Sequence, residues 1–126
     1  MKVLVIDDNK DLTEAIYDSL DSPDIECTMI NDGKAGLDEI LKERGKYNLI
    51  LLDIAMPNFS GMDILRTLKK DDLLKSENVI IFTASSITDR DIDDFVASGA
   101  KGVLKKPVSL DELTELVEKY NTIIDN

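Results

Sequence analysis

Five polar side chains of this sequence stand at or just after short apolar runs. They are Asp7, Asp8, Asp53, Thr83 and Lys106. Carboxylates that lie within a few ångströms of one another all stay ionised only when a cation joins them, because like charges raise each other's pKa. Hard oxygen ligands in this number suit Mg²⁺, which keeps water molecules that a phosphate can replace. The set therefore points to phosphoryl chemistry, provided that the fold brings these side chains together.

Asp53 is the best candidate for a nucleophile among the three carboxylates. It ends the middle apolar run and precedes a proline-containing loop that keeps it accessible. A carboxylate that attacks a phosphoryl group forms an aspartyl phosphate. Lys106 can pair with a carboxylate in the empty site and with a phosphoryl oxygen in the filled one. The hydroxyl of Thr83 can donate a hydrogen bond to another phosphoryl oxygen.

The apolar runs predict the strands that position these residues. The runs are Val3–Ile6, Ile25–Ile30, Leu49–Leu52, Val79–Phe82 and Val103–Leu104. Each is too short for a helix, most are rich in Val and Ile, and turn-forming or charged residues flank them. The first, third and fourth are continuous rather than alternating, which is typical of strands covered on both faces in a parallel sheet.

Segments with the apolar spacing of helices lie between and after the runs. Their apolar faces are Leu12/Ala15/Ile16/Leu20, Leu37/Ile40/Leu41, Leu65/Leu68, Ile92/Phe95/Val96 and Leu113/Leu116/Val117/Tyr120. Ser109 and Glu112 predict a capping box at the start of the last helix, and Gly99 is expected to end the fourth. The order predicts a doubly wound α/β fold of the (βα)5 type, with a five-stranded parallel sheet and helices on both faces. We expect one domain over residues 1–126, with its functional crevice outside the carboxyl ends of the strands.

The composition narrows the classes of function. The chain has 126 residues, with 26 acidic and 15 basic side chains and a net charge of −11. Such a surface repels nucleic-acid backbones and anionic lipids. The absence of histidine removes Ser-His and Cys-His catalysis, and the lone Cys27 can form neither an internal disulfide nor a zinc site. No apolar run reaches the ~20 residues of a membrane span, and a signal peptide is not evident. We expect a cytoplasmic protein that binds neither nucleic acid nor membrane.

The whole chain resembles the receiver domains of two-component response regulators, and its fold class is then flavodoxin-like or CheY-like. The matching stretches are Val5–Asn9, Leu51–Pro57, Ser60–Asp63, Phe82–Ala84, and Gly99-Ala100 through Lys106-Pro107. Each motif alone is weak, since an Asp-Asp pair at a strand end is common. Together, and in register with the predicted strands, they are specific.

The resemblance implies a role for each candidate residue. Asp53 is similar to the phosphorylated aspartate, and Asp7 and Asp8 to the acidic pair that positions Mg²⁺. Ala55 is then expected to give its backbone carbonyl to the metal, Thr83 to be the switch hydroxyl, and Lys106, rather than Lys105, to be the family's lysine.

The resemblance also implies partners and output. The donor would be a phosphohistidine on a sensor histidine kinase or histidine phosphotransfer protein, or a small acyl phosphate. We expect a signalling switch rather than an enzyme, with only self-phosphorylation and slow aspartyl-phosphate hydrolysis. We expect no output domain, a downstream protein target, and a monomer or weak dimer. The acidic stretch of Asp89, Asp91, Asp93 and Asp94 is either a solvated helix face or part of the output surface.

Three positions bear on how such a switch would work. Receivers usually carry tyrosine or phenylalanine where this chain has Val103, so the coupled movement of hydroxyl and aromatic ring is open. Ala55 and Ser85 occupy the two positions that tune dephosphorylation in the family. These two residue types alone do not predict the lifetime of the aspartyl phosphate.

Other readings remain open from the residues alone. The chain can be a degenerate receiver that takes no phosphate and acts as a constitutive protein-binding module. A haloacid-dehalogenase-type phosphatase is disfavoured because Asp7 and Asp8 are adjacent rather than one residue apart. Nucleotide or flavin binding is disfavoured because no glycine-rich phosphate loop follows the first run. As ordinary residues, Asp7 and Asp8 would cap a turn or helix, and Lys106 would be a surface charge.

Overall fold

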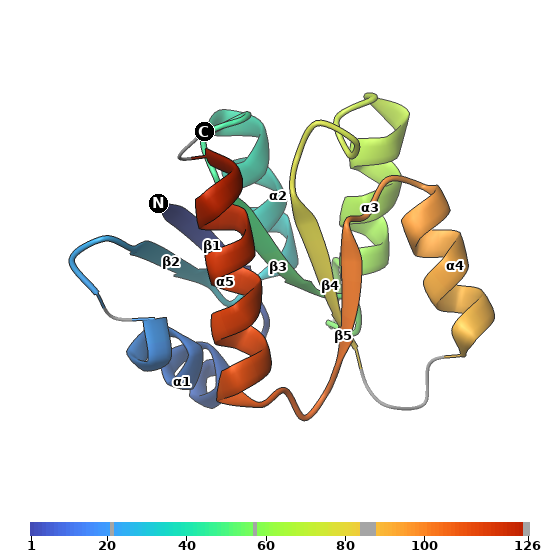
Figure 1. Cartoon of the computed structure of the whole chain (residues 1–126). Helices are drawn as coiled ribbons and strands as arrows, with labels where there is room; N and C mark the ends of the chain where they lie inside the picture. Colours follow the sequence, from blue (N-terminus) through green and yellow to red (C-terminus); the bar gives the residue numbers. More distant parts are fainter. Residues whose placement is uncertain (21, 57, 84–87, 125–126) are drawn as a thin grey trace.

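The computed structural model describes residues 1–20, 22–56, 58–83 and 88–124. Strands and helices alternate along the chain as predicted (Figure 1). The elements are β1 (Lys2–Ile6), α1 (Lys10–Leu20), β2 (Glu26–Ile30), α2 (Gly33–Lys42), β3 (Leu49–Asp53), α3 (Gly61–Lys70), β4 (Val79–Thr83), α4 (Asp89–Ala97), β5 (Gly102–Lys105) and α5 (Leu110–Ile124). In the part of the chain so described, no helix is long and apolar enough to cross a membrane.

The strands form one sheet in the order β2-β1-β3-β4-β5, and all neighbouring pairs are parallel. Every residue of β3 and β4 is buried, whereas the edge strands β2 and β5 are mostly half-buried. The continuous apolar runs therefore mark the central strands, because only these strands are covered by helices on both faces. The predicted doubly wound fold is confirmed.

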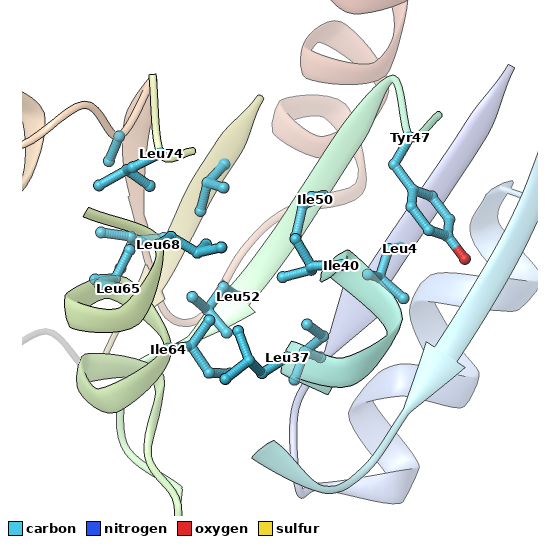
Figure 2. Packing of buried hydrophobic residues seen from close by; sticks show 14 of the residues in the cluster. Leu4, Leu37, Ile40, Tyr47, Ile50, Leu52, Ile64, Leu65, Leu68 and Leu74 are labelled. Carbon is cyan, nitrogen blue, oxygen red and sulfur yellow. The ribbon is translucent and has the colours of Figure 1, made fainter. Parts of the chain in front are cut away.

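Two hydrophobic clusters hold the helices to the sheet. On one face, α2 and α3 pack against alternate residues of β1, β3 and β4, including Leu4, Ile50 and Leu52 (Figure 2). On the other face, α1 and α5 pack against the remaining residues of the same strands, including Val5, Leu51 and Phe82. Since successive strand residues point to opposite faces, each central strand contributes residues to both clusters.

Helix α4 is attached more loosely than the other helices of its face. None of its residues is buried, whereas α3 buries Ile64, Leu65 and Leu68. A capping box between Thr88 and Asp91 begins α4. At its end, Gly99 has a φ of 121°, and its N–H donates to the carbonyl of Val96 at 3.0 Å, as expected for a glycine C-cap.

Two further details complete the helical layers. At the start of α5, the hydroxyl of Ser109 accepts a hydrogen bond from the N–H of Glu112 at 3.1 Å, where the sequence predicts a cap. Val103, which replaces the usual aromatic residue, lies half-buried on β5 and packs against the cluster that contains α2 and α3. The acidic residues of α4 are exposed, as both a solvated helix face and an output surface require.

Candidate functional site

The candidate residues lie where the strand connections change direction. The chain leaves β1 toward β2 on one side, while β3 lies on the other side of β1. In open α/β sheets, ligands bind in the crevice outside the carboxyl ends of the strands at this point. Asp7 and Asp8 follow β1, and Asp53 is the last residue of β3. Since Ile6 pairs with Leu52, Asp7 and Asp53 emerge side by side.

The three aspartates form one cluster of carboxylates. Asp7, Asp8 and Asp53 each offer an oxygen, and these oxygens lie within 4.8 Å of one another. Asp7 and Asp53 are buried, whereas Asp8 is exposed. Three hard oxygen donors that reach solvent on one side fit a divalent cation such as Mg²⁺, which retains water in its remaining positions. The chemistry of this donor set therefore suits the expected metal.

Lys106 reaches into the same cluster from the end of β5. Its Nζ donates to Oδ2 of Asp7 at 2.9 Å and lies 3.5 Å from Oδ2 of Asp53. Burial alone lowers the pKa of Lys106, but its hydrogen bond to Asp7 and the negative charges of Asp53 and Asp7 outweigh that effect, so the pKa of the ammonium is raised above its usual value. The side chain is 29% exposed. This lysine is a permanent positive charge that bridges the two buried carboxylates.

The carboxylate of Asp53 is held in a defined direction. The N–H of Ala55 donates to its Oδ1 at 3.1 Å, and Oδ2 faces Lys106. Burial raises the pKa of Asp53, and the charge of Asp7 adds to this rise, while the hydrogen bond from Ala55 and the charge of Lys106 oppose it. The net direction is upward, so the fold destabilises the charged form of this carboxyl when only protein groups surround it.

Thr83 ends β4 beside the same crevice. It is buried, and its backbone carbonyl accepts a hydrogen bond from the N–H of Lys106 at 2.7 Å. The peptide bond between Lys106 and Pro107 is cis, and Lys105 is exposed as expected. The strand ends thus gather the five predicted residues at one edge of the sheet. Of the other positions that the motifs include, Pro57, Ala84 and Ser85 lie outside the described residues.

Sequence reasoning missed one polar group beside this cluster. The side-chain amide of Asn31 donates to the backbone carbonyl of Asp7 at 2.8 Å and to the hydroxyl of Thr13 at 3.0 Å. A signal was present, because Asn31 directly follows the second apolar run. The predicted site residues follow the other four runs, and Asn31 occupies the corresponding position after this one.

The sequence profile of the response regulator receiver domain matches residues 3–118. This chain belongs to the response regulator receiver family. The receiver is 37% identical over 116 residues to the transcriptional regulatory protein HprR of Escherichia coli K12, covering 90% of this chain and 48% of that protein. It is 34% identical over 113 residues to the transcriptional regulatory protein DltR of Streptococcus agalactiae, with the same coverage. The receiver thus spans about half the length of these curated relatives.

Solved structures agree with this assignment. The receiver domain of the Francisella response regulator 1452 is 30% identical to this chain, with a TM-score of 0.78, and the match covers 96% of this chain and 93% of that one. Receiver domains are signalling switches, and they typically bind Mg²⁺ at an acidic pocket, to which the cluster of Asp7, Asp8 and Asp53 corresponds in composition.

Proposed function

We propose that this receiver accepts a phosphoryl group on Asp53 and thereby switches a protein-binding surface in phosphorelay signalling. One observation carries the proposal: Asp53 ends its strand between two further carboxylates and the ammonium of Lys106. An isolated buried carboxylate would be neutralised by protonation. Here the surrounding charges are arranged so that a cation and a phosphoryl group can satisfy them together.

In the reaction that we infer, an oxygen of Asp53 attacks the phosphorus of the donor. The new P–O bond forms as the P–N bond of a phosphohistidine, or the P–O bond of an acyl phosphate, breaks. The leaving group keeps that electron pair: the imidazole nitrogen of a phosphohistidine takes a proton, whereas the carboxylate of an acyl phosphate leaves as the anion. Water later cleaves the aspartyl phosphate and restores the carboxylate. Mg²⁺, when bound, supplies positive charge that offsets the negative charge of the phosphoryl oxygens.

The protein's own residues then have distinct tasks. Asp7, Asp8 and Asp53 bind the cation through side-chain oxygens, together with the backbone carbonyl of Ala55. Lys106 stabilises a phosphoryl oxygen, since its ammonium already lies 3.5 Å from Asp53. Thr83 donates from its hydroxyl to another phosphoryl oxygen and changes position as it does so. On the next strand, Val103 pairs with Ile81, two residues before Thr83, so this movement would not depend on an aromatic ring at position 103.

We further propose that residues 1–126 act as one cytoplasmic domain, a monomer or weak dimer, and not as an enzyme on other substrates. The partners would be a sensor histidine kinase or histidine phosphotransfer protein and a downstream protein target. The net charge of −11 disfavours direct contact of this domain with nucleic acid or membrane and favours a basic protein surface.

The test is the intact mass of the protein after incubation with acetyl phosphate, with Mg²⁺ or with EDTA. We expect the wild type to gain one phosphoryl group only with Mg²⁺, Asp53→Asn to gain none, and the exposed-site control Asp38→Asn to behave as the wild type. If neither acetyl phosphate nor a phosphohistidine donor modifies the wild type, the chain is instead a degenerate receiver that binds its partner constitutively.

A further inference from the structure

The backbone of Asp7 is anchored on both sides to the end of β2. Its N–H donates to the carbonyl of Ile30 at 3.1 Å, which continues the β1–β2 register by one residue. In a continuing parallel ladder, the carbonyl of Asp7 would next accept from the backbone N–H of residue 32. The chain instead turns into α2, with Asp32 as its N-cap. The side chain of Asn31 supplies the missing donor, at 2.8 Å from the carbonyl oxygen.

The same amide connects the loop after β1 to helix α1. Nδ2 of Asn31 also donates to the hydroxyl oxygen of Thr13 at 3.0 Å, and Thr13 is only 1% exposed. The N–H of Thr13 donates in turn to the carbonyl of Asn9 at 3.1 Å. The acidic pair thus lies on a short irregular segment that is fixed before and after Asp8. The side chain of Asn31 thus links the ends of β1 and β2 to α1.

The chemistry of the two acceptors requires a double donor at position 31. The carbonyl of Asp7 can only accept. The hydroxyl of Thr13 gives its single proton to the carbonyl of Lys10 at 3.1 Å, so toward Asn31 it can also only accept. A primary amide has two N–H groups on one atom and satisfies both acceptors at once. A carboxylate at this position would face two oxygens, and a serine could satisfy only one of them.

We propose that Asn31 is a positioning residue for the divalent-cation site, which it serves by fixing the backbone of Asp7 and Asp8. The inference rests on the proposed function in one respect, the use of Asp7 and Asp8 as Mg²⁺ ligands. Mg²⁺ demands near-ideal octahedral geometry and tolerates displaced ligands poorly. Groups that orient metal ligands typically change metal affinity by about 10- to 100-fold when they are removed.

The experiment compares Asn31→Ala with the matched control Asn78→Ala. Asn78 is also half-buried and also donates through Nδ2 to a backbone carbonyl, that of Asn48, at 3.0 Å. It precedes β4 and therefore lies at the amino ends of the parallel strands, whereas the aspartates lie at the carboxyl ends. Mg²⁺ affinity is measured by calorimetric titration of the unphosphorylated protein. Thermal unfolding in EDTA reports the stability of each variant without metal.

We expect Asn31→Ala to raise the Kd for Mg²⁺ about tenfold, while Asn78→Ala keeps the wild-type Kd at a similar loss of stability. Saturating Mg²⁺ should restore the extent of phosphorylation of Asn31→Ala by acetyl phosphate. Equal Kd values for the wild type and both variants would overturn the proposal, as would a wild type that binds no Mg²⁺.

A second pair of variants covers the case in which Asn31→Ala does not fold. Thr13→Val removes one of the two acceptors of Asn31 and should raise the Kd for Mg²⁺. Thr13→Ser keeps the hydroxyl and should bind Mg²⁺ with the Kd of the wild type. Unchanged affinity in Thr13→Val would contradict the role of this link. A wild type that binds Mg²⁺ with the predicted dependence on Asn31, but takes no phosphoryl group, would refute the proposed function and leave the positioning role intact.

Discussion

At the scale of single residues, the site sets the negative charges of two buried carboxylates against the positive charge of one ammonium. Lys106 lies 2.9 Å from Asp7 and 3.5 Å from Asp53, and this lysine is the basic side chain seen in contact with the aspartates among the described residues. In the phosphorylated state that we propose, the same ammonium must also serve the phosphoryl group. The charge state of Asp53 and the presence of Lys106 therefore determine how stable the protein is in the absence of a divalent cation.

The raised pKa of Asp53 predicts a pH dependence of stability. The folded chain holds the proton of Asp53 more tightly than the unfolded chain does. The contribution of this group is therefore complete below the unfolded value of about 4 and is lost as pH rises through the folded pKa. In EDTA, Asp53→Asn should gain stability relative to the wild type as pH rises above about 4. Urea unfolding at several pH values measures this gain, and parallel profiles for the two proteins would refute it.

Removal of the ammonium of Lys106 should lower the stability of the protein, whereas Asp53→Asn should raise it. Removing the ammonium should also favour the binding of Mg²⁺. In Lys106→Met, the carboxylates of Asp7 and Asp53 keep their backbone hydrogen bonds but lose the positive charge that lies between them. We expect a loss of about 2 kcal/mol in EDTA, below the cost for a fully buried pair because Lys106 is 29% exposed. Mg²⁺ should raise the Tm of this variant more than that of the wild type, since the cation no longer competes with the lysine. An equal or smaller rise in Tm would contradict this account.

At the scale of elements, the position of Asp53 depends on close packing between β3 and the start of α3. A Cβ on Gly61 would lie 2.2 Å from the carbonyl oxygen of Asp53 and 2.5 Å from Cα of Ile54. Both are backbone atoms, so no side-chain rotation can relieve the contact. Ser60 and Asp63 form the capping box that begins α3 at this point. The loop between β3 and α3, which carries Ala55, is therefore constrained at both ends.

Gly61→Ala should destabilise the fold by about 3 kcal/mol, because α3 must move away from the end of β3. Helix propensity alone would favour alanine over glycine by about 1 kcal/mol, so the sign of the effect tests the contact. The control is Gly102→Ala, whose Cβ would meet only the terminal methyl group of Ile80 at 3.2 Å and should cost under about 1 kcal/mol. Denaturant unfolding of both variants decides the question, and equal costs would count against a special contact at Gly61.

At the scale of the whole molecule, the net charge of −11 opposes the compact state, and part of that charge is concentrated in the site. Sodium chloride should raise the Tm by screening the overall repulsion. Magnesium chloride at equal ionic strength should raise it further, because a specifically bound ion stabilises the folded state. Asp8→Asn should lose only this second increment, and the exposed-site control Asp38→Asn should keep both. Equal effects of the two salts on the wild type would argue against a specific cation site.

Much of this architecture was predictable because it follows from burial. The central strands are unbroken apolar runs in the sequence, and the rule that ligands bind at the carboxyl ends of parallel strands predicts that Asp7, Asp53 and Lys106 lie together. The bounds of the edge strands were predicted less exactly. The second run begins at Ile25, but β2 begins at Glu26, because the N–H of Ile25 bonds to the carbonyl of Ser22 in a turn.

The features that the sequence did not predict depend on which backbone atoms become neighbours in the folded chain. Gly61 matters because a carbonyl of another element lies against it, and Asn31 matters because a strand ends one donor short. Neither relation has a periodicity or a spacing along the chain. The different exposure of the acidic pair, with Asp7 buried and Asp8 open to solvent, likewise follows only from the packed loop.

The proposed function requires that a carboxylate oxygen of Asp53 forms the new P–O bond. The protein is incubated with acetyl phosphate and Mg²⁺, treated with borohydride, which reduces an aspartyl phosphate to homoserine, and mapped by peptide mass spectrometry. We predict homoserine at position 53 alone, with Asp7 and Asp8 intact. Homoserine at another aspartate, or at none while the intact protein still carries a phosphoryl group, would contradict the assignment.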